Sequence, residues 1–390
     1  MTHDLQQIRA ELPALQHGAY LNTGTYGPLS CAAAAAIESA QRKQLLEGRL
    51  GMHIWEENRA TADELRGRFA RLLGCATDEI ALTHHTTDGM NIATWGVPYQ
   101  PGDELVTTSW EHPGGLLPVY AVARRFNLTV RVIRLEEDDD AQALLQKFER
   151  AIGPRTRLVS AMHVSWKTGV ILPIAEIAEL AHQHGGLLAV DGAQSAGAIP
   201  LDMQALGVDF YAIPGQKWLC GPEGIGALYV RSDRLGELRQ TYVGYPSMRD
   251  GEAFDETGVF LPSPGAARYE VGTVYRPAQA GMWAGLQWME ELGFDWIYQR
   301  IQTITQQARA ALAEIPGVRV IHTATHAGLT GFAIDGHDAA AANEKLGETG
   351  VQIRSVPSPD LLRVSTHFFN DETDICQLAQ AAAELARSAA

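Results

Sequence analysis

Short apolar runs alternate with longer helical patterns along the chain from about Ile80 to Val230. The short runs are rich in β-branched residues, which is typical of buried strands, and the helical patterns between most of them fit crossover connections. This alternation predicts an α/β fold with a mostly parallel, seven-stranded sheet covered by helices on both faces. The predicted strands are Ile80–Thr83, Glu104–Thr108, Leu128–Ile133, Leu158–His163, Leu187–Val190, Phe210–Ile213 and Ile225–Val230.

A different pattern follows Val230. Residues 245–265 are rich in Gly, Pro and charge without clear periodicity, so we predict an irregular connection there. The remainder has an α+β pattern. Its predicted helices are Pro277–Leu292, Asp295–Ile315 and a final helix from Asp371 onward. Its predicted strands are Val318–His322 and Gly331–Ile334. The domains that we predict are an N-terminal arm associated with the smaller domain (1–20), a large domain (21–260) and a smaller α+β domain (261–390).

Charge and cysteine usage narrow the possible partners of this 390-residue chain. Its formal net charge of −15 repels polyphosphate backbones and anionic lipid surfaces, so neither nucleic acid nor a membrane is an expected partner. The four cysteines form no CxxC pair, which is typical of a reducing compartment. The N-terminus lacks a signal-peptide pattern and no run reaches transmembrane length, so we expect a cytoplasmic protein.

Four predicted strand ends carry residues suited to chemistry, and ligands of open parallel sheets bind just outside such ends. After the strand Ile80–Thr83, the segment HHTTDG contains Thr86 and Thr87 and leads into a helical pattern. Hydroxyls and free backbone N–H groups at a helix N-terminus bind anions such as a phosphate monoester. The same residue types are also ordinary N-caps, so capping alone is the alternative.

A carboxylate, Asp191, ends the wholly apolar strand Leu187–Val190. Burying an unpaired carboxylate is costly, so Asp191 should face a cation, a metal or a protonated ring nitrogen. A helix cap or a structural ion pair is the alternative.

Lys217 lies among glycines and apolar residues in the segment PGQKWLCGPEGIG. These glycines and apolar residues cannot pair with its charge, so desolvation should lower its pKa and favour Schiff-base chemistry. The glycines lead into the strand Ile225–Val230 and not into a helix, which argues against a dinucleotide-binding loop. No Ser or Thr follows Lys217, which argues against a P-loop.

The segment SWEHPGG after Glu104–Thr108 places His112 where a flat ring can lie on a planar cofactor, although a single His is more often structural. The His pairs at 84/85 and 182/184 lack the carboxylate or Cys partners of a zinc site, so no metal site is predicted.

The phosphate cradle, the flat His112 ring, the strand-end Asp191 and the desolvated Lys217 together match pyridoxal-5′-phosphate (PLP). The phosphate anchors the cofactor, the aldehyde forms a Schiff base with the lysine, and the carboxylate keeps the ring nitrogen protonated.

These motifs resemble the class V aminotransferase family of fold-type-I PLP enzymes, which includes cysteine desulfurases, kynureninases, isopenicillin N epimerase and carbon–sulfur lyases. The most specific are DGAQSAGAIPLD from Asp191 and QKWLCGPEGIGALYV from Gln216, and the resemblance covers nearly the whole chain. It is strongest toward L-cysteine/cystine carbon–sulfur lyases. The motifs behind that likeness are WEHPGGL at Trp110, HVSWKTGVILPIAEI at His163, YVGY at Tyr242 and RSVPSPDLLR at Arg354.

The resemblance implies a role for each matching position. Lys217 is expected to form the Schiff base and to act as acid and base, Asp191 to pair with the pyridine nitrogen, and Gln194 to donate to ring O3′. His112 is expected to stack on the ring. The remaining cofactor-binding positions are Thr86, Thr87 and Gln216, with Gly272 and Thr273 reaching the phosphate of a neighbouring subunit.

That last pair implies a homodimer with shared active sites. The resemblance further implies that Arg363 and Arg354 clamp the α-carboxylate of an amino acid substrate, a task suited to the guanidinium fork. A surface salt bridge is the alternative for both arginines. Trp166 stands where desulfurases have Asn, so we expect it to change how the substrate is seated.

Other departures from the family pattern bear on the reaction. Relatives often have Ser or Thr three residues before the lysine and His just before it, whereas this chain has Pro214 and Gln216, so phosphate binding is expected to use other donors. The stretch from Arg354 to Arg363 contains no Cys, and a desulfurase needs a thiol there to accept sulfur as a persulfide. We therefore do not expect a persulfide-forming desulfurase.

Three functional hypotheses remain. The favoured one is β-elimination from cystine or cysteine, in which Lys217 removes the α-proton, a thiolate or persulfide leaves, and pyruvate and ammonia are the other products. The same residues serve an aminotransferase if the cofactor C4′ is reprotonated, or an epimerase if the opposite Cα face is. The third hypothesis is an inactive PLP-fold regulator, against which the intact Lys217, Asp191 and Arg363 argue.

Overall fold

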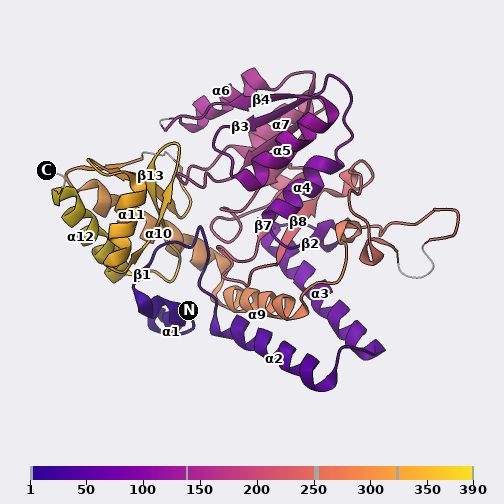
Figure 1. The fold of residues 1–390 in the computed structure, drawn as a ribbon, viewed down its shortest axis with the longest axis horizontal. Helices are drawn as coiled ribbons and strands as arrows, with labels where there is room; N and C mark the ends of the chain where they lie inside the picture. Colours follow the sequence, from indigo (N-terminus) through magenta and orange to yellow (C-terminus); the bar gives the residue numbers. More distant parts are fainter. Residues whose placement is uncertain (1–2, 138, 250–253, 322–324, 389–390) are drawn as a thin grey trace.

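A seven-stranded sheet, called the large sheet below, forms the centre of the protein (Figure 1). The structure is a computed structural model and describes residues 3–137, 139–249, 254–321 and 325–388. The strand order is β2-β8-β7-β6-β5-β3-β4, in which β8 alone is antiparallel to its neighbours. The strands are β2 (Ile80–Thr83), β3 (Glu104–Thr108), β4 (Thr129–Ile133), β5 (Thr156–Met162), β6 (Leu187–Asp191), β7 (Phe210–Pro214) and β8 (Gly226–Val230).

Each predicted strand of the large sheet is confirmed, with ends that agree within two residues. Successive residues of a strand point to opposite faces, and both faces are buried. Val190 packs in one apolar cluster, together with side chains from α3, α6 and α7, whereas Ala189 packs in another with α4 and α5. Those helices are α3 (Met52–Leu73), α4 (Thr86–Gly96), α5 (Pro113–Phe126), α6 (Ala141–Ala151) and α7 (Ile174–Gln183).

The C-terminal part contains a second, four-stranded antiparallel sheet, called the small sheet below, with the order β12-β13-β10-β9. The predicted α+β pattern is confirmed here for α9, α10, β9, β10 and α12, although β9 ends at Val320 and His322 lies outside the described residues. The elements are α9 (Arg276–Leu292), α10 (Phe294–Ala313), β9 (Val318–Val320), β10 (Leu329–Ile334), α11 (Ala339–Glu348), β12 (Arg354–Val356), β13 (Leu361–Ser365) and α12 (Glu372–Ser388).

The N-terminal residues lie against this C-terminal part. Strand β1 (Ala19–Tyr20) pairs in parallel with β11 (Val351–Gln352), and Arg9 Nη1 donates to the Asp374 carboxylate at 2.9 Å. Helix α2 (Cys31–Glu47) follows and packs alongside α9 (Figure 1). The domain boundaries at residues 20 and 260 stay predictions.

The connection over residues 245–265 is irregular, as predicted, in its described part. It contains a short 3-10 turn at Tyr245–Ser247 and an isolated bridge between Met248 and Pro262. Among the described residues, no helix combines the length and the apolar character needed to cross a membrane.

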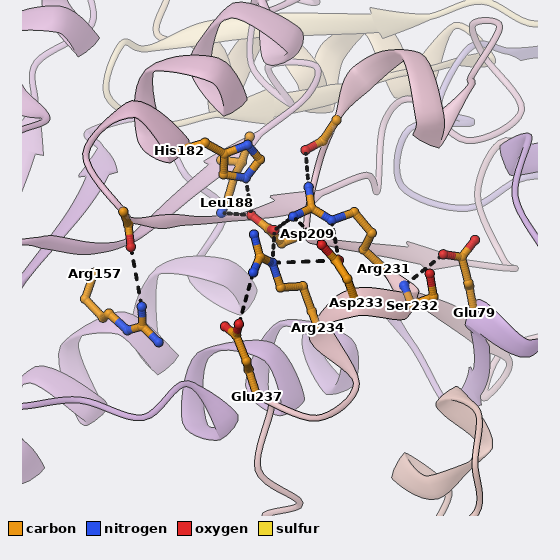
Figure 2. Close-up of polar contacts among 12 residues, drawn as sticks. Glu79, Arg157, His182, Leu188, Asp209, Arg231, Ser232, Asp233, Arg234 and Glu237 are labelled. Atoms are coloured by element: carbon orange, nitrogen blue, oxygen red, sulfur yellow. Dashed lines mark hydrogen bonds and ion pairs between the residues drawn. The ribbon is translucent and has the colours of Figure 1, made fainter.

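A buried charge cluster stabilises the amino-terminal edge of the large sheet (Figure 2). Asp209, which is fully buried just before β7, accepts hydrogen bonds from His182 Nε2 and the Leu188 amide, both at 2.8 Å. Arg234 Nε and Arg231 Nη2 lie 2.9 and 3.0 Å from its other oxygen. These partners outweigh the desolvation of the carboxylate and hold the pKa of Asp209 below its ordinary value of 3.8.

Replacing Asp209 with Asn is expected to lower the free energy of unfolding by about 3 kcal/mol at neutral pH, because Arg231 and Arg234 lose a buried counter-charge. Because the folded pKa is depressed, this contribution is present above pH 3.8 and is lost as the pH falls through the folded value. Urea denaturation of both proteins as a function of pH checks this. A constant difference down to strongly acid pH would contradict it.

Candidate active site

Strand ends that carry residues suited to chemistry meet at the carboxyl edge of the large sheet. Asp191 at the end of β6 lies beside Met162 of β5 and Ala212 of β7, and Pro214 at the end of β7 lies beside Gly226. Gly226 in turn faces the last residue of β2, Thr83. The segments that follow β2, β6 and β7 therefore begin next to one another, as the strand-end argument predicts.

The start of α4 has the form of an anion site. The helix cap is supplied by His85, whose Nδ1 accepts from the Asp88 amide at 3.0 Å, so neither threonine is needed as a cap. Thr86 Oγ1 is buried without a hydrogen-bond partner. A Cβ on Gly114 would lie 2.3 Å from Thr87 Oγ1, so only glycine lets α5 approach α4 here. Two hydroxyls and the first free amides of α4 are left to bind an anion.

Asp191 keeps one carboxylate oxygen directed into the site. It is buried, and its Oδ1 accepts from the Ala193 amide at 2.9 Å. This hydrogen bond orders the turn after β6. The other oxygen, Oδ2, lies 3.3 Å from where a Cβ of Gly115 would stand, at the start of α5. It forms no ion pair with any described residue.

Lys217 is the amine of this site. It follows β7 and stands half-buried in the segment that packs against Gly27, where a Cβ would lie 2.1 Å from the Lys217 carbonyl oxygen. Burial lowers the pKa of Lys217 from 10.5 to about 8, the charge of Asp191 opposes this shift, and Arg363 and Arg354 add to it. Near neutral pH a useful fraction of the amine is therefore unprotonated and nucleophilic.

His112 presents a neutral ring next to Trp166. Its Nδ1 accepts from the Gly114 amide at 3.1 Å and caps α5, and its ring meets the Trp166 ring edge-on at 5.4 Å. Burial lowers the pKa of His112, and the Lys217 charge adds to this effect. The Trp166 indole is fixed by a 2.8 Å hydrogen bond from Nε1 to the Trp110 carbonyl.

Arg363 is a fully buried cation, and no acidic side chain in the described part of the chain pairs with it. Its guanidinium donates to the Trp166 carbonyl at 3.0 Å, to Asn22 Oδ1 at 3.1 Å and to Thr25 Oγ1 at 2.8 Å, while Nε has no partner. Arg354 reaches the same Thr25 hydroxyl at 3.3 Å. Burial and the charge of Arg354 lower the pKa of Arg363 to about 9. Two converging cations that pair with no described acid favour an anionic ligand over the salt-bridge alternative.

Gln194 and Gln216 also border this region. Gln194 is buried, donates to the Gly24 carbonyl at 2.9 Å and accepts from Trp218 Nε1 at 2.8 Å. Its amide group has a second N–H, which is the one available for a cofactor oxygen. Gln216 Oε1 is buried without a partner.

No described contact joins Gly272 or Thr273 to Lys217. Thr273 lines a surface groove of about 1320 Å³ that Trp55 and Tyr245 also line, and its Oγ1 lies 3.4 Å from the Tyr245 hydroxyl. Their contribution to a neighbouring subunit stays a prediction.

Sequence reasoning did not identify three residues of this site. Asn22 and Thr25 hold Arg363 but belong to an N-terminal segment without a motif. Glu111 is buried beside the site, where Thr108 Oγ1 donates to its Oε1 at 2.7 Å. Burial raises the pKa of Glu111 to about 8, and the Asp191 charge contributes to this rise. When Glu111 is neutral, Asp191 is the charged carboxylate of the two. The one sequence signal that pointed to Glu111 was its position just before His112.

The donor set fits the groups of PLP: hydroxyls and amides for a phosphate, a flat imidazole for a ring, a carboxylate for a ring nitrogen and an amine for an aldehyde. The unpartnered Thr86 hydroxyl is the observation that most favours the fit. The described residues include no group of three or more His, Cys, Asp or Glu side chains placed to hold a metal ion.

This architecture is that of the fold-type-I PLP-dependent enzymes. A mutant of C-DES with glycine covalently linked to its PLP cofactor is similar over 98% of this chain and 100% of its own, with a TM-score of 0.91 and 33% identity. The cystine C–S lyase C-DES in complex with its reaction product cysteine persulfide gives a TM-score of 0.90 at 33% identity, over 96% and 99% of the two chains.

A family model for class-V aminotransferases matches residues 38–378, and the chain belongs to that family. A probable cysteine desulfurase of Mycolicibacterium paratuberculosis is 32% identical over 371 residues, which are 90% of this chain but 52% of the relative. The chain thus spans about half the length of that relative. A probable cysteine desulfurase of Halalkalibacterium halodurans is 32% identical over 78% of this chain and 77% of its own.

Proposed function

We propose that this protein binds PLP through Lys217 and cleaves the carbon–sulfur bond of cystine or cysteine by β-elimination. The observation that carries the proposal is Arg363, a buried cation without an acidic partner among the described residues, whose charge acts on the Lys217 amine. Such an arrangement places the carboxylate of an amino acid next to a reactive nitrogen.

Each side chain has a task that follows from its surroundings. Thr86 and Thr87 bind the phosphate at the α4 N-terminus, and His112 offers its neutral ring to the cofactor face. Asp191 Oδ2 holds a proton on the ring nitrogen. PLP, when bound, supplies an aldehyde for the amine and a ring that accepts electrons.

The substrate is held and deprotonated by two further groups. Arg363 and Arg354 bind the α-carboxylate, and Trp166 limits the space beside it. Lys217 Nζ, once it is free and unprotonated, takes the proton from Cα. The sulfur then leaves with the electron pair of the Cβ–S bond as a thiolate or persulfide, and hydrolysis of the remaining fragment releases pyruvate and ammonia.

The turn between β12 and β13 and the thiols of Cys220 and Cys376 favour a lyase over a persulfide-forming desulfurase. The turn between β12 and β13 reads Pro-Ser-Pro-Asp and offers no sulfur nucleophile. Cys220 is buried, and its burial raises the pKa of the thiol well above the ordinary value of 9.0. Cys376 is exposed on α12, which packs in the C-terminal part.

We also propose a homodimer whose active sites lie at the subunit interface. The groove lined by Thr273 is bordered by exposed apolar side chains, including Met52 at 74% and Trp55 at 56% exposure. A surface of this kind favours burial against a partner.

Mixing the purified protein with cystine, and separately with amino acids that carry no sulfur on Cβ, is expected to yield pyruvate and sulfane sulfur from cystine alone. Lactate dehydrogenase coupling measures pyruvate, and cyanolysis measures sulfane sulfur. A keto acid together with a pyridoxamine absorption spectrum would instead establish an aminotransferase. If PLP is bound and neither product forms, both enzymatic proposals are wrong.

A further inference from the structure

The turn between β12 and β13 connects the two arginines of the site. The strands pair up to Val356 and Leu361, so the turn consists of residues 357–360 alone. Arg354 begins β12 and Arg363 is its partner across the ladder. The turn therefore joins the two strands that carry these guanidinium groups.

Lys167 fastens this turn to the segment that follows β5. Its Nζ donates to the Pro357 carbonyl at 3.1 Å and to the Ser358 carbonyl at 2.5 Å. Lys167 is 5% exposed and forms no ion pair with a described residue, so these carbonyls and the Trp166 ring, 5.3 Å away, are what compensate its charge.

The turn is held on its other side as well. The Asp360 carboxylate accepts from the Ala339 amide at 2.9 Å, at the start of α11. Ser358 has a φ of 50°, a conformation that residues other than glycine keep only where surrounding contacts impose it. The four residues of the turn are exposed or half-exposed. They are held by Lys167 on one side and by the start of α11 on the other.

Trp166, next to Lys167 in the chain, contacts both arginines of the proposed carboxylate site. The Trp166 carbonyl accepts from Arg363, and the Trp166 ring lies 5.8 Å from the Arg354 guanidinium. The backbone of Lys167 also packs closely on β10, where a Cβ on Gly331 would lie 2.9 Å from the Lys167 carbonyl oxygen. Lys167 is therefore joined to the small sheet through both its side chain and its main chain.

We propose that Lys167 is a positioning residue that latches the 357–360 turn and thereby sets the spacing of Arg354 and Arg363. The latch determines how well a substrate carboxylate is bound. The effect on substrate binding rests on the proposed lyase function, whereas the latch itself does not.

Lys167→Met removes the donors and the charge while keeping a similar volume, and Lys167→Arg retains donors. We expect hydrogen–deuterium exchange of peptides spanning 354–363 in the PLP-bound protein to be about 10-fold faster or more in Lys167→Met. The KM for cystine should rise about 10-fold with kcat changed less, because Lys167 does not touch the reacting atoms. Lys167→Arg should recover most of both values.

Lys345→Met, at an exposed lysine of α11, is the matched control and should match the native protein in exchange and in KM. If Lys167→Met does not fold, Lys167→Gln and Lys167→Arg decide the matter by the same two measurements. Unchanged exchange at 354–363 would overturn the latch whatever the reaction is. If exchange is faster in Lys167→Met but the native protein forms no pyruvate from cystine, the latch is upheld and the lyase proposal is refuted.

Discussion

Lys217→Ala is expected to reduce turnover of cystine by about 10²- to 10⁴-fold or more, because the substitution removes both the covalent attachment point and the proton acceptor. Borohydride reduction followed by peptide mapping should find a pyridoxyl group on the peptide that contains residue 217 in the native protein. The variant should carry no such label. Lys147→Ala, at a lysine paired with Asp139 away from the site, should keep full labelling and turnover.

The lowered pKa of Lys217 adds a pH dependence to this result. Because the folded value is about 8 and not 10.5, the amine loses its proton as the pH approaches 8. Reconstitution of the PLP-free protein should therefore accelerate from about pH 6.5 to about pH 8 and then level off. Stopped-flow absorbance measures the rate. A rate that continues to rise toward pH 10, or a label on another lysine, would refute the assignment.

Arg363→Gln is expected to lower kcat/KM for cystine by about 30- to 1000-fold, because the substrate carboxylate loses a buried, charged hydrogen-bond partner. Arg363→Lys keeps the charge but loses the fork, and should fall between the two. The unfolding midpoint of Arg363→Gln should stay at or above that of the native protein, because burial disfavours the Arg363 charge in the absence of a ligand. Steady-state kinetics and thermal denaturation measure the two quantities.

Arg231→Gln is the matched control for this pair of measurements. Arg231 is a structural arginine that pairs with Asp209 at 3.0 Å. Its variant should lose stability and keep kcat/KM per folded molecule. If Arg363→Gln also behaves in this way, Arg363 is structural and the carboxylate site is elsewhere.

The strand-end residues were predictable because they depend on local patterns. β2 and β3 begin and end where the predicted runs do, Asp191 follows such a run directly, and Lys217 lies in the short segment after another. β12 and β13 were not predicted. The run Leu361–Ser365 is buried on both faces, so it shows no alternation, and the Pro-Ser-Pro-Asp turn before it reads as a loop.

The contacts that define the carboxylate site could not be predicted, because they join distant parts of the chain. Arg363 is held by Asn22 and Thr25, more than 330 positions earlier in the sequence. Lys167 meets a turn 190 positions later. The choice between cap and anion site at Thr86 was likewise open until His85 proved to be the cap. A propensity argument does not distinguish which of several polar residues caps a helix.

The pairing of β1 with β11 has a consequence for biosynthesis. Ala19 is synthesised long before its partner Val351. The large sheet is complete in sequence by Val230, so it can fold during translation while the first strand waits without a partner. Asn22 and Thr25 follow that strand and hold Arg363, so these contacts form only after residue 363 has been synthesised.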